Sequence, residues 1–156
     1  MRAAEGEAMS HESATGYARD LLAIDAYWLL ASDATSILID VRTRAEWAYV
    51  GAPDIRTIGK IPYFLEWQSY PSMQVDQLFA SRLGATLESA GVEPGAALVF
   101  LCRSGARSRH AAIAMTRAGW TPSYNVSDGF EGPPDGLKRR GGVCGWKAAG
   151  LPWTQS

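Results

Sequence analysis

ALVFLCRSGARS, residues 97–108, runs from five apolar residues into a polar loop that begins with Cys102. The apolar part predicts a buried strand, because it is short and rich in branched and aromatic side chains. Residues 109–118, which follow the loop, favour a helix. A strand, a tight loop and a helix in this order leave the first N–H groups of the helix unpaired, and these groups point toward an anion in the loop. We expect that anion to be the Cys102 thiolate.

A cysteine in such a loop is a candidate nucleophile. Free cysteine has a pKa of about 8.5, and a helix N-terminus with nearby arginines lowers the pKa of a thiol to roughly 3.5–7.5. Arg103 and Arg107 supply those arginines in this chain. The sequence therefore predicts that most of the Cys102 sulfur is nucleophilic at neutral pH.

The rest of the chain alternates helical and strand patterns. Periodic apolar residues predict helices over 24–31, 43–49 and 75–90, and short apolar runs predict strands over 37–39, within 61–67 and over 122–126. This alternation implies an α/β fold, in which helices cover both faces of a mostly parallel sheet. Asp40 directly follows the 37–39 strand, at the edge where ligands of open α/β sheets gather.

Three segments resemble signatures of the rhodanese family of sulfurtransferases. The loop at 102–108 resembles its active-site loop, Ile37 to Trp47 its first signature and Gly145 to Trp153 its closing signature. The similarity covers roughly residues 24–153. It implies a rhodanese-like three-layer fold, a single domain over 21–156, and a Cys102 that carries a transferable sulfur as a persulfide.

Size and composition fit one globular domain. The chain has 156 residues, of which 47% are hydrophobic and 20% charged. Its formal charge of −1 gives no electrostatic case for a nucleic acid or an anionic membrane as partner, and the basic run at 138–140 is interpreted as a solvated loop. We expect residues 1–20 to form a flexible tail before the domain.

The cysteine count and the start of the chain predict a cytoplasmic location. Two cysteines, Cys102 and Cys144, are too few for a disulfide scaffold, which favours a reducing compartment. Residues 1–16 have no apolar core of signal-peptide length, and no window approaches the roughly 18 apolar residues that span a bilayer.

Loop length separates two chemistries. Four residues lie between Cys102 and Arg107. The resemblance implies that this spacing suits sulfurtransferases, whereas cysteine phosphatases on the same frame use five residues and form a wider bowl for phosphate. Two alternatives stay open: a cysteine-dependent phosphatase or arsenate-reductase-like enzyme, and a non-catalytic rhodanese-like regulatory module.

The resemblance also implies substrates. Cys102 is expected to take sulfur from a small anionic donor such as thiosulfate, or from another persulfide, and to pass it to a protein or small-thiol acceptor. No cofactor is expected, because the sulfur is carried covalently. No metal is expected either, since His11 and His110 lack zinc-ligand spacing with the two cysteines.

The expected active-site loop consists of Arg103, Ser104, Gly105, Ala106, Arg107 and Ser108. Arg103 is expected near the mouth, where it attracts an anionic donor. Arg107 is expected to face inward and pair with Glu46, the partner that the resemblance suggests. Gly105 is the position most suited to a positive φ or a close backbone approach. Ser104 is a candidate hydroxyl donor to the sulfur, and Ser108 is either such a donor or the helix cap.

Several residues outside the loop carry less specific expectations. Asp40 either orients Arg42 or a water near the pocket or is a turn residue, and the resemblance implies that the Asp40–Arg42 pair is largely structural. Phe130, in a glycine-rich loop, is expected at the pocket mouth. Cys144 is either a resolving thiol or, as the simpler interpretation has it, a small packed residue. The insertion at 132–142 either covers the active site or is a surface excursion.

Overall fold

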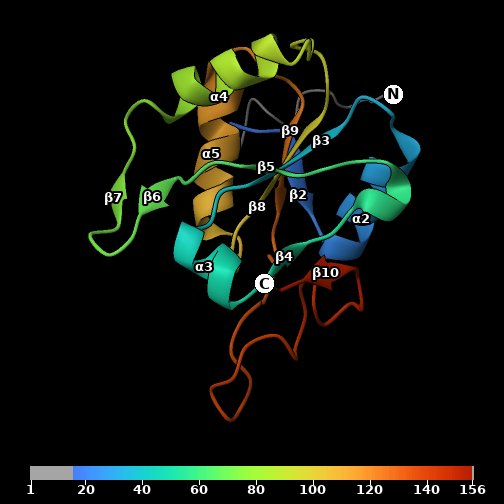
Figure 1. Cartoon of the computed structure of the whole chain (residues 1–156), viewed down its shortest axis with the longest axis vertical. Helices are drawn as coiled ribbons and strands as arrows, with labels where there is room; N and C mark the ends of the chain where they lie inside the picture. Colours follow the sequence, from blue (N-terminus) through green and yellow to red (C-terminus); the bar gives the residue numbers. More distant parts are fainter. Residues whose placement is uncertain (1–15, 156) are drawn as a thin grey trace.

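A computed structural model describes residues 16–155, and its centre is a five-stranded sheet. The strands are β2 (Arg19–Leu21), β3 (Ile37–Asp40), β5 (Tyr63–Phe64), β8 (Leu98–Leu101) and β9 (Ser123–Val126). Their order across the sheet is β2-β9-β8-β3-β5, and every neighbouring pair is parallel (Figure 1). The predicted α/β fold with a parallel central sheet is confirmed.

The remaining elements surround this sheet. The helices are α2 (Ala23–Ser32), α3 (Arg44–Tyr49), α4 (Phe79–Ser89) and α5 (Ala106–Arg117), with a short 3₁₀ helix at Arg56–Ile58. Two antiparallel pairs lie outside it, namely β4 (Ala52–Pro53) with β10 (Trp153–Thr154) and β6 (Gln68–Ser69) with β7 (Gln74–Val75). Within residues 16–155 no helix combines the length and apolarity that crossing a bilayer requires.

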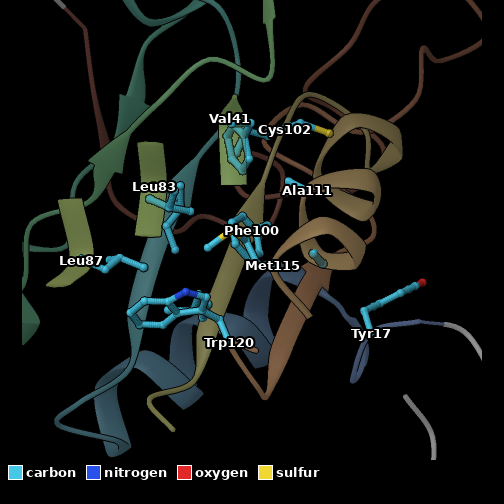
Figure 2. Packing of buried hydrophobic residues seen from close by; sticks show 13 residues of the cluster. Tyr17, Val41, Leu83, Leu87, Phe100, Cys102, Ala111, Met115 and Trp120 are labelled. Atoms are coloured by element: carbon cyan, nitrogen blue, oxygen red, sulfur yellow. The ribbon is translucent and has the colours of Figure 1, made fainter. Parts of the chain in front are cut away.

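Strand β8 sends alternate side chains into two buried clusters. Leu98 and Phe100 pack in the cluster that α4 and α5 complete, whereas Val99 and Leu101 pack in the cluster that α2 completes. Cys102 continues the alternation of a strand onto the α5 side. Figure 2 shows its sulfur at the end of β8, beside the first turn of α5. The sheet pattern thus delivers the thiol to the helix N-terminus.

The fold begins earlier than expected. Tyr17 is buried in the core, and β2 pairs with β9 so that Asp20 lies opposite Asn125. The predicted boundary after residue 20 is therefore wrong, because a short edge strand with few apolar residues leaves little periodic signal. The remainder of the predicted tail, residues 1–15, lies outside the described residues.

Two helix boundaries also differ from the prediction. The helix expected over 75–90 begins only at Phe79, because the Asp76 carboxylate accepts the Leu78 N–H at 2.9 Å and forms a turn there. Leu78, in the turn before the helix, is exposed. The helix expected over 109–118 begins at Ala106, so residues 106–108 of the polar loop belong to it. The predicted helices at 24–31 and 43–49 and the predicted strands at 37–39 and 122–126 are confirmed. The strand predicted within 61–67 is confirmed as the two-residue edge strand β5.

The closing segment completes the cluster under α2. Trp146 is fully buried there, packs edge-on against Tyr27, and donates its indole N–H to the Pro152 carbonyl at 2.6 Å. Leu151 is buried in the same cluster. Residues 146–154 therefore pack as part of the domain.

Candidate active site

The loop after β8 curls around the Cys102 sulfur. Sγ accepts the backbone N–H of Gly105 at 3.2 Å and that of Ser108 at 3.3 Å. Gly105 is the N-cap of α5, so both donors come from helix-start N–H groups that have no partner inside the helix. The cysteine itself is 1% exposed. This geometry places the sulfur at the positive end of the α5 dipole.

Gly105 is required by both conformation and space. Its φ is +105°, and a Cβ atom there would collide with the Ser127 carbonyl oxygen. The segment after β9 also supports the loop from behind, since Phe130 donates its N–H to the Cys102 carbonyl at 2.8 Å. The positive φ expected for Gly105 is confirmed, and the loop is held rigidly between α5 and the segment at 127–132.

The two serines of the loop have different environments. The Ser108 hydroxyl lies 3.1 Å from Sγ and donates to Asn125 Oδ1 at 2.6 Å. The helix cap is Gly105, so the capping role considered for Ser108 is wrong; its hydroxyl contacts the sulfur, but the hydroxyl hydrogen goes to Asn125. Among the hydrogen bonds of the described residues, none joins Ser104 to the sulfur, although Ser104 and Cys102 line the same surface pocket.

Arg107 and Glu46 form the ion pair that the resemblance suggested. The guanidinium donates to both carboxylate oxygens, at 2.7 and 3.0 Å. A capping box positions Glu46, because its carboxylate accepts the Thr43 N–H while the Thr43 hydroxyl accepts the Glu46 N–H. Burial alone would raise the pKa of Glu46, but hydrogen bonds from Arg107 and Thr43 outweigh it and lower the pKa to about 2. The pair ties α3 to the start of α5.

Glu46→Gln tests this pair. Because the folded pKa of about 2 lies below the ordinary 4.5, the pair stabilises the fold fully above pH 4.5 and loses this effect as the pH falls toward 2. We expect the substitution to lower the free energy of unfolding at neutral pH by about 2–3 kcal/mol and to flatten the loss of stability in acid. Urea unfolding at neutral pH and at about pH 3 measures both effects. Glu88→Gln, on the exposed side of α4, is the control. An acid profile of Glu46→Gln as steep as that of the parent would contradict the assignment.

Asp40 and Arg42 form a second pair, which is completely buried. Arg42 donates to Asp40 Oδ2 at 2.8 Å, to the Gly51 carbonyl at 2.8 Å, and lies 4.2 Å above the Phe130 ring. Neither residue lines the pocket that contains Cys102. The pair joins the end of β3 to β4 and to the segment after β9, which favours the structural role over the orientation of a substrate.

The Cys102 thiol lines a pocket of about 790 Å³. The loop contributes Cys102, Arg103, Ser104, Ala106 and Arg107; the other lining residues are Thr43, Ala45, Glu46, Tyr49, Val50, Gln68, Tyr70, Met73, Glu131 and Arg140. Arg103 is exposed, as expected for a residue at the mouth. The prediction for Phe130 is wrong, because its ring is fully buried under Arg42 and the adjacent Glu131 lines the pocket instead.

Sequence reasoning missed the outer wall of this pocket. Tyr70 and Met73 lie on the hairpin that joins β6 to β7, and Tyr49 ends α3. Tyr49 and Tyr70 remain 81% and 68% exposed. Two-residue strands leave no period in the sequence, so the only available signal was the aromatic residues in a polar stretch.

Cys144 and the insertion lie near the edge of the site. Cys144 is free, half-buried and absent from the pocket lining. Of the insertion at 132–142, Arg140 lines the pocket and donates to the Gly132 carbonyl at 2.7 Å, while Lys138 and Arg139 are exposed. Within the described part of the chain, no group of three or more His, Cys, Asp or Glu side chains is placed to hold a metal ion.

Comparison with known proteins identifies the family of the chain. The family model of the rhodanese-like domain matches residues 24–132. The chain belongs to the rhodanese family. An uncharacterized Rickettsia conorii protein is 36% identical to this chain over 135 residues, which are 86% of this chain and 96% of the relative. A protein from the dnaA 5′ region of Rickettsia montanensis, also uncharacterized, gives the same identity and coverage.

Two solved structures resemble this chain. The crystal structure of Rv0390 from M. tuberculosis is 40% identical, has a TM-score of 0.79, and aligns over 90% of this chain and 99% of its own. The solution structure of the polysulfide-sulfur transferase homodimer from Wolinella succinogenes has a TM-score of 0.58 at 24% identity, with 93% and 84% of the two chains covered. At 24% identity, the similarity to the Wolinella succinogenes protein shows only that the two proteins share a fold.

Proposed function

We propose that this rhodanese is a sulfurtransferase that carries a sulfane sulfur as a persulfide on Cys102. The observation that carries the proposal is the pair of N–H groups, from Gly105 and Ser108, that converge on Sγ inside the pocket. Such donors stabilise a charged sulfur, much as an oxyanion hole stabilises an oxyanion. The loop length of four residues between Cys102 and Arg107 supports a single sulfur rather than a phosphate as the bound group.

The reaction has two displacements. In the first, the Cys102 thiolate attacks the outer sulfur of a donor such as thiosulfate; the new S–S bond forms as the donor S–S bond breaks, and sulfite leaves with the electron pair. In the second, an acceptor thiolate attacks the outer sulfur of the persulfide, and the Cys102 thiolate leaves. Arg103 and Arg140, which line the pocket, contribute positive charge that attracts an anionic donor.

The pocket also supports a thiol acceptor larger than the donor. Its volume of about 790 Å³ far exceeds the volume of a thiosulfate ion. Both cysteines are free, and free cysteines are typical of a reducing compartment, which supports the cytoplasm as the location of the protein.

Intact-mass measurement after thiosulfate treatment tests the proposal. The parent protein is expected to gain one sulfur atom, which cyanide removes. Cys102→Ser is expected to gain none, while the matched control Cys144→Ser gains sulfur as the parent does. Sulfur uptake by Cys102→Ser, or none by the parent, would refute the persulfide assignment. Release of phosphate from an aryl phosphate without sulfur uptake would favour the phosphatase alternative.

A further inference from the structure

A chain of polar side chains leads from the Cys102 sulfur to the edge of the sheet. The Ser108 hydroxyl, 3.1 Å from Sγ, donates to Asn125 Oδ1 at 2.6 Å, and Asn125 Nδ2 donates to Asp20 Oδ1 at 2.9 Å. Ser108 and Asn125 are buried and Asp20 is exposed. The sheet register creates the last link, since Asp20 of β2 lies opposite Asn125 of β9. We name these three residues the Asp20 chain.

The carboxylate of Asp20 fixes the direction of every hydrogen bond in the chain. A carboxylate only accepts, so the amide NH₂ of Asn125 faces it and the amide oxygen faces Ser108. The hydroxyl has a single hydrogen, which that oxygen takes. Ser108 therefore presents a lone pair to the sulfur. This contact is favourable when Sγ carries a hydrogen, and unfavourable when Sγ is a bare anion.

Tyr17 strengthens the outer end of the Asp20 chain. Its hydroxyl donates to Asp20 Oδ1 at 2.8 Å. Burial and the hydrogen bond to Asp20 raise the pKa of Tyr17 to about 12, so the phenol keeps its proton and Asp20 remains the acceptor. Of the other charged groups around it, Arg109 interacts electrostatically with Tyr17, and Arg19 and Asp25 line the same surface hollow as Asp20. At the inner end, Arg107 pairs with Glu46 and interacts electrostatically with Cys102 and Asp40.

We propose that Asp20 is a positioning residue that acts through Asn125 and Ser108 to disfavour the bare Cys102 thiolate relative to the states in which Sγ is uncharged. Those states are the thiol and the persulfide, because the outer sulfur carries the charge of a persulfide. The N–H groups of Gly105 and Ser108 act in the opposite direction and allow the thiolate to form. The thiolate that forms lacks one hydrogen bond, which keeps it nucleophilic.

The effect on sulfur loading rests on the proposed function. At alkaline pH the unloaded enzyme is a thiolate, and loading exchanges thiolate and thiosulfate for persulfide and sulfite, with the same total charge on both sides. Since the Asp20 chain disfavours only the unloaded thiolate among the enzyme forms, it shifts this equilibrium toward the loaded enzyme.

The direct test is the pH profile of Cys102 alkylation by iodoacetamide in a Cys144→Ser background. Asp20→Asn removes the carboxylate and offers an N–H to the side-chain carbonyl of Asn125. The Asn125 amide can then turn over so that its NH₂ group faces Ser108, and the Ser108 hydroxyl can donate its hydrogen to the sulfur. The alkylation midpoint is expected to fall by about 1 pH unit, the size of one charge-assisted hydrogen bond. Asp20→Ala is expected to shift it in the same direction. Asp25→Asn is the matched control, because Asp25 carries the same charge and lines the same surface hollow as Asp20.

A double-variant cycle separates the hydrogen-bonded chain from a charge effect through space. In a Ser108→Ala background, Asp20→Asn is expected to leave the midpoint unchanged, because no hydroxyl remains to reverse. A purely electrostatic effect of Asp20 would persist in that background. An unchanged midpoint in both Asp20 variants, or the same shift without Ser108, would overturn the proposal.

A second measurement concerns the persulfide. At alkaline pH and a fixed ratio of thiosulfate to sulfite, the loading equilibrium constant of Asp20→Asn is expected to be roughly tenfold lower than that of the parent. If the loading equilibrium constant of Asp20→Asn equalled that of the parent, the proposed effect of Asp20 on sulfur loading would be wrong. Alkylation requires no sulfur transfer, so a parent protein that takes up no sulfur would refute the proposed function while the alkylation cycle still decides on the Asp20 chain.

Discussion

Arg42→Met is expected to lower the free energy of unfolding by about 3–5 kcal/mol, because it leaves the Asp40 carboxylate charged, buried and without its partner. Both side chains are fully buried, and the guanidinium also satisfies the Gly51 carbonyl. For a domain of this size the loss corresponds to a fall in melting temperature of about 10 °C. Thermal unfolding followed by circular dichroism measures it.

The chain offers a matched control for this prediction. Asp54 and Arg56 have the same spacing as Asp40 and Arg42 and the same bonds, from the arginine N–H and Nε to Oδ1 and from NH2 to Oδ2. The Arg56 side chain is 78% exposed. Arg56→Met is therefore expected to leave the melting temperature almost unchanged. Equal effects of the two substitutions would show that burial does not decide the cost.

The companion replacement of both buried partners distinguishes an unpaired charge from lost packing. Asp40→Leu combined with Arg42→Met is expected to be more stable than Arg42→Met alone, because it leaves no buried ion behind. If the double variant were less stable than Arg42→Met alone, the loss of stability would come from the lost packing of the arginine side chain and not from an unpaired charge.

Gly105→Ala is expected to slow persulfide formation from thiosulfate by about 10²–10³-fold, the usual effect of removing one donor from an oxyanion hole. A φ of +105° is strained for alanine, and the added Cβ meets the Ser127 carbonyl. The loop must therefore shift, and the N–H of residue 105 leaves the Cys102 sulfur. Stopped-flow measurement of a single loading event gives the rate.

Gly95→Ala is the matched control for the loop substitution. Gly95 lies in the turn before β8, and a Cβ there meets no atom within 4 Å. It is expected to load sulfur at the parent rate. If Gly105→Ala also loaded at that rate, convergence of the backbone donors on Sγ would not govern the chemistry.

Local patterns predicted the centre of the fold and of the site. The apolar run before Cys102, the helix-forming residues after it and the glycine between them place the thiol at a helix start without further information. The pair of Glu46 and Arg107 joins residues far apart in the chain, and only the family resemblance indicated it. The Thr43 capping box explains why Glu46 lies in the right place.

The misses share a physical cause, which is that they depend on tertiary contacts between short segments. Strand β2 forms because it pairs with the edge of β9. The residues next to Asp20 in the sequence therefore give no signal that Asp20 contacts Asn125. Phe130 looks like a loop aromatic in the sequence, yet Arg42 from the first signature covers it. Asn125 did carry a signal, since it is a polar residue within a buried strand, where an unpaired amide would be costly.

The buried Trp146 shows how much of the chain must be kept together for the domain to retain its core. It lies beyond residue 132, where the family match ends, but its indole fills the interior beneath α2. At the other end, Tyr17 and β2 precede residue 24, where the match begins. Any gene fusion or excision that kept only residues 24–132 would remove part of the interior at both ends. Recombination that preserves this fold must therefore keep both flanking segments as well.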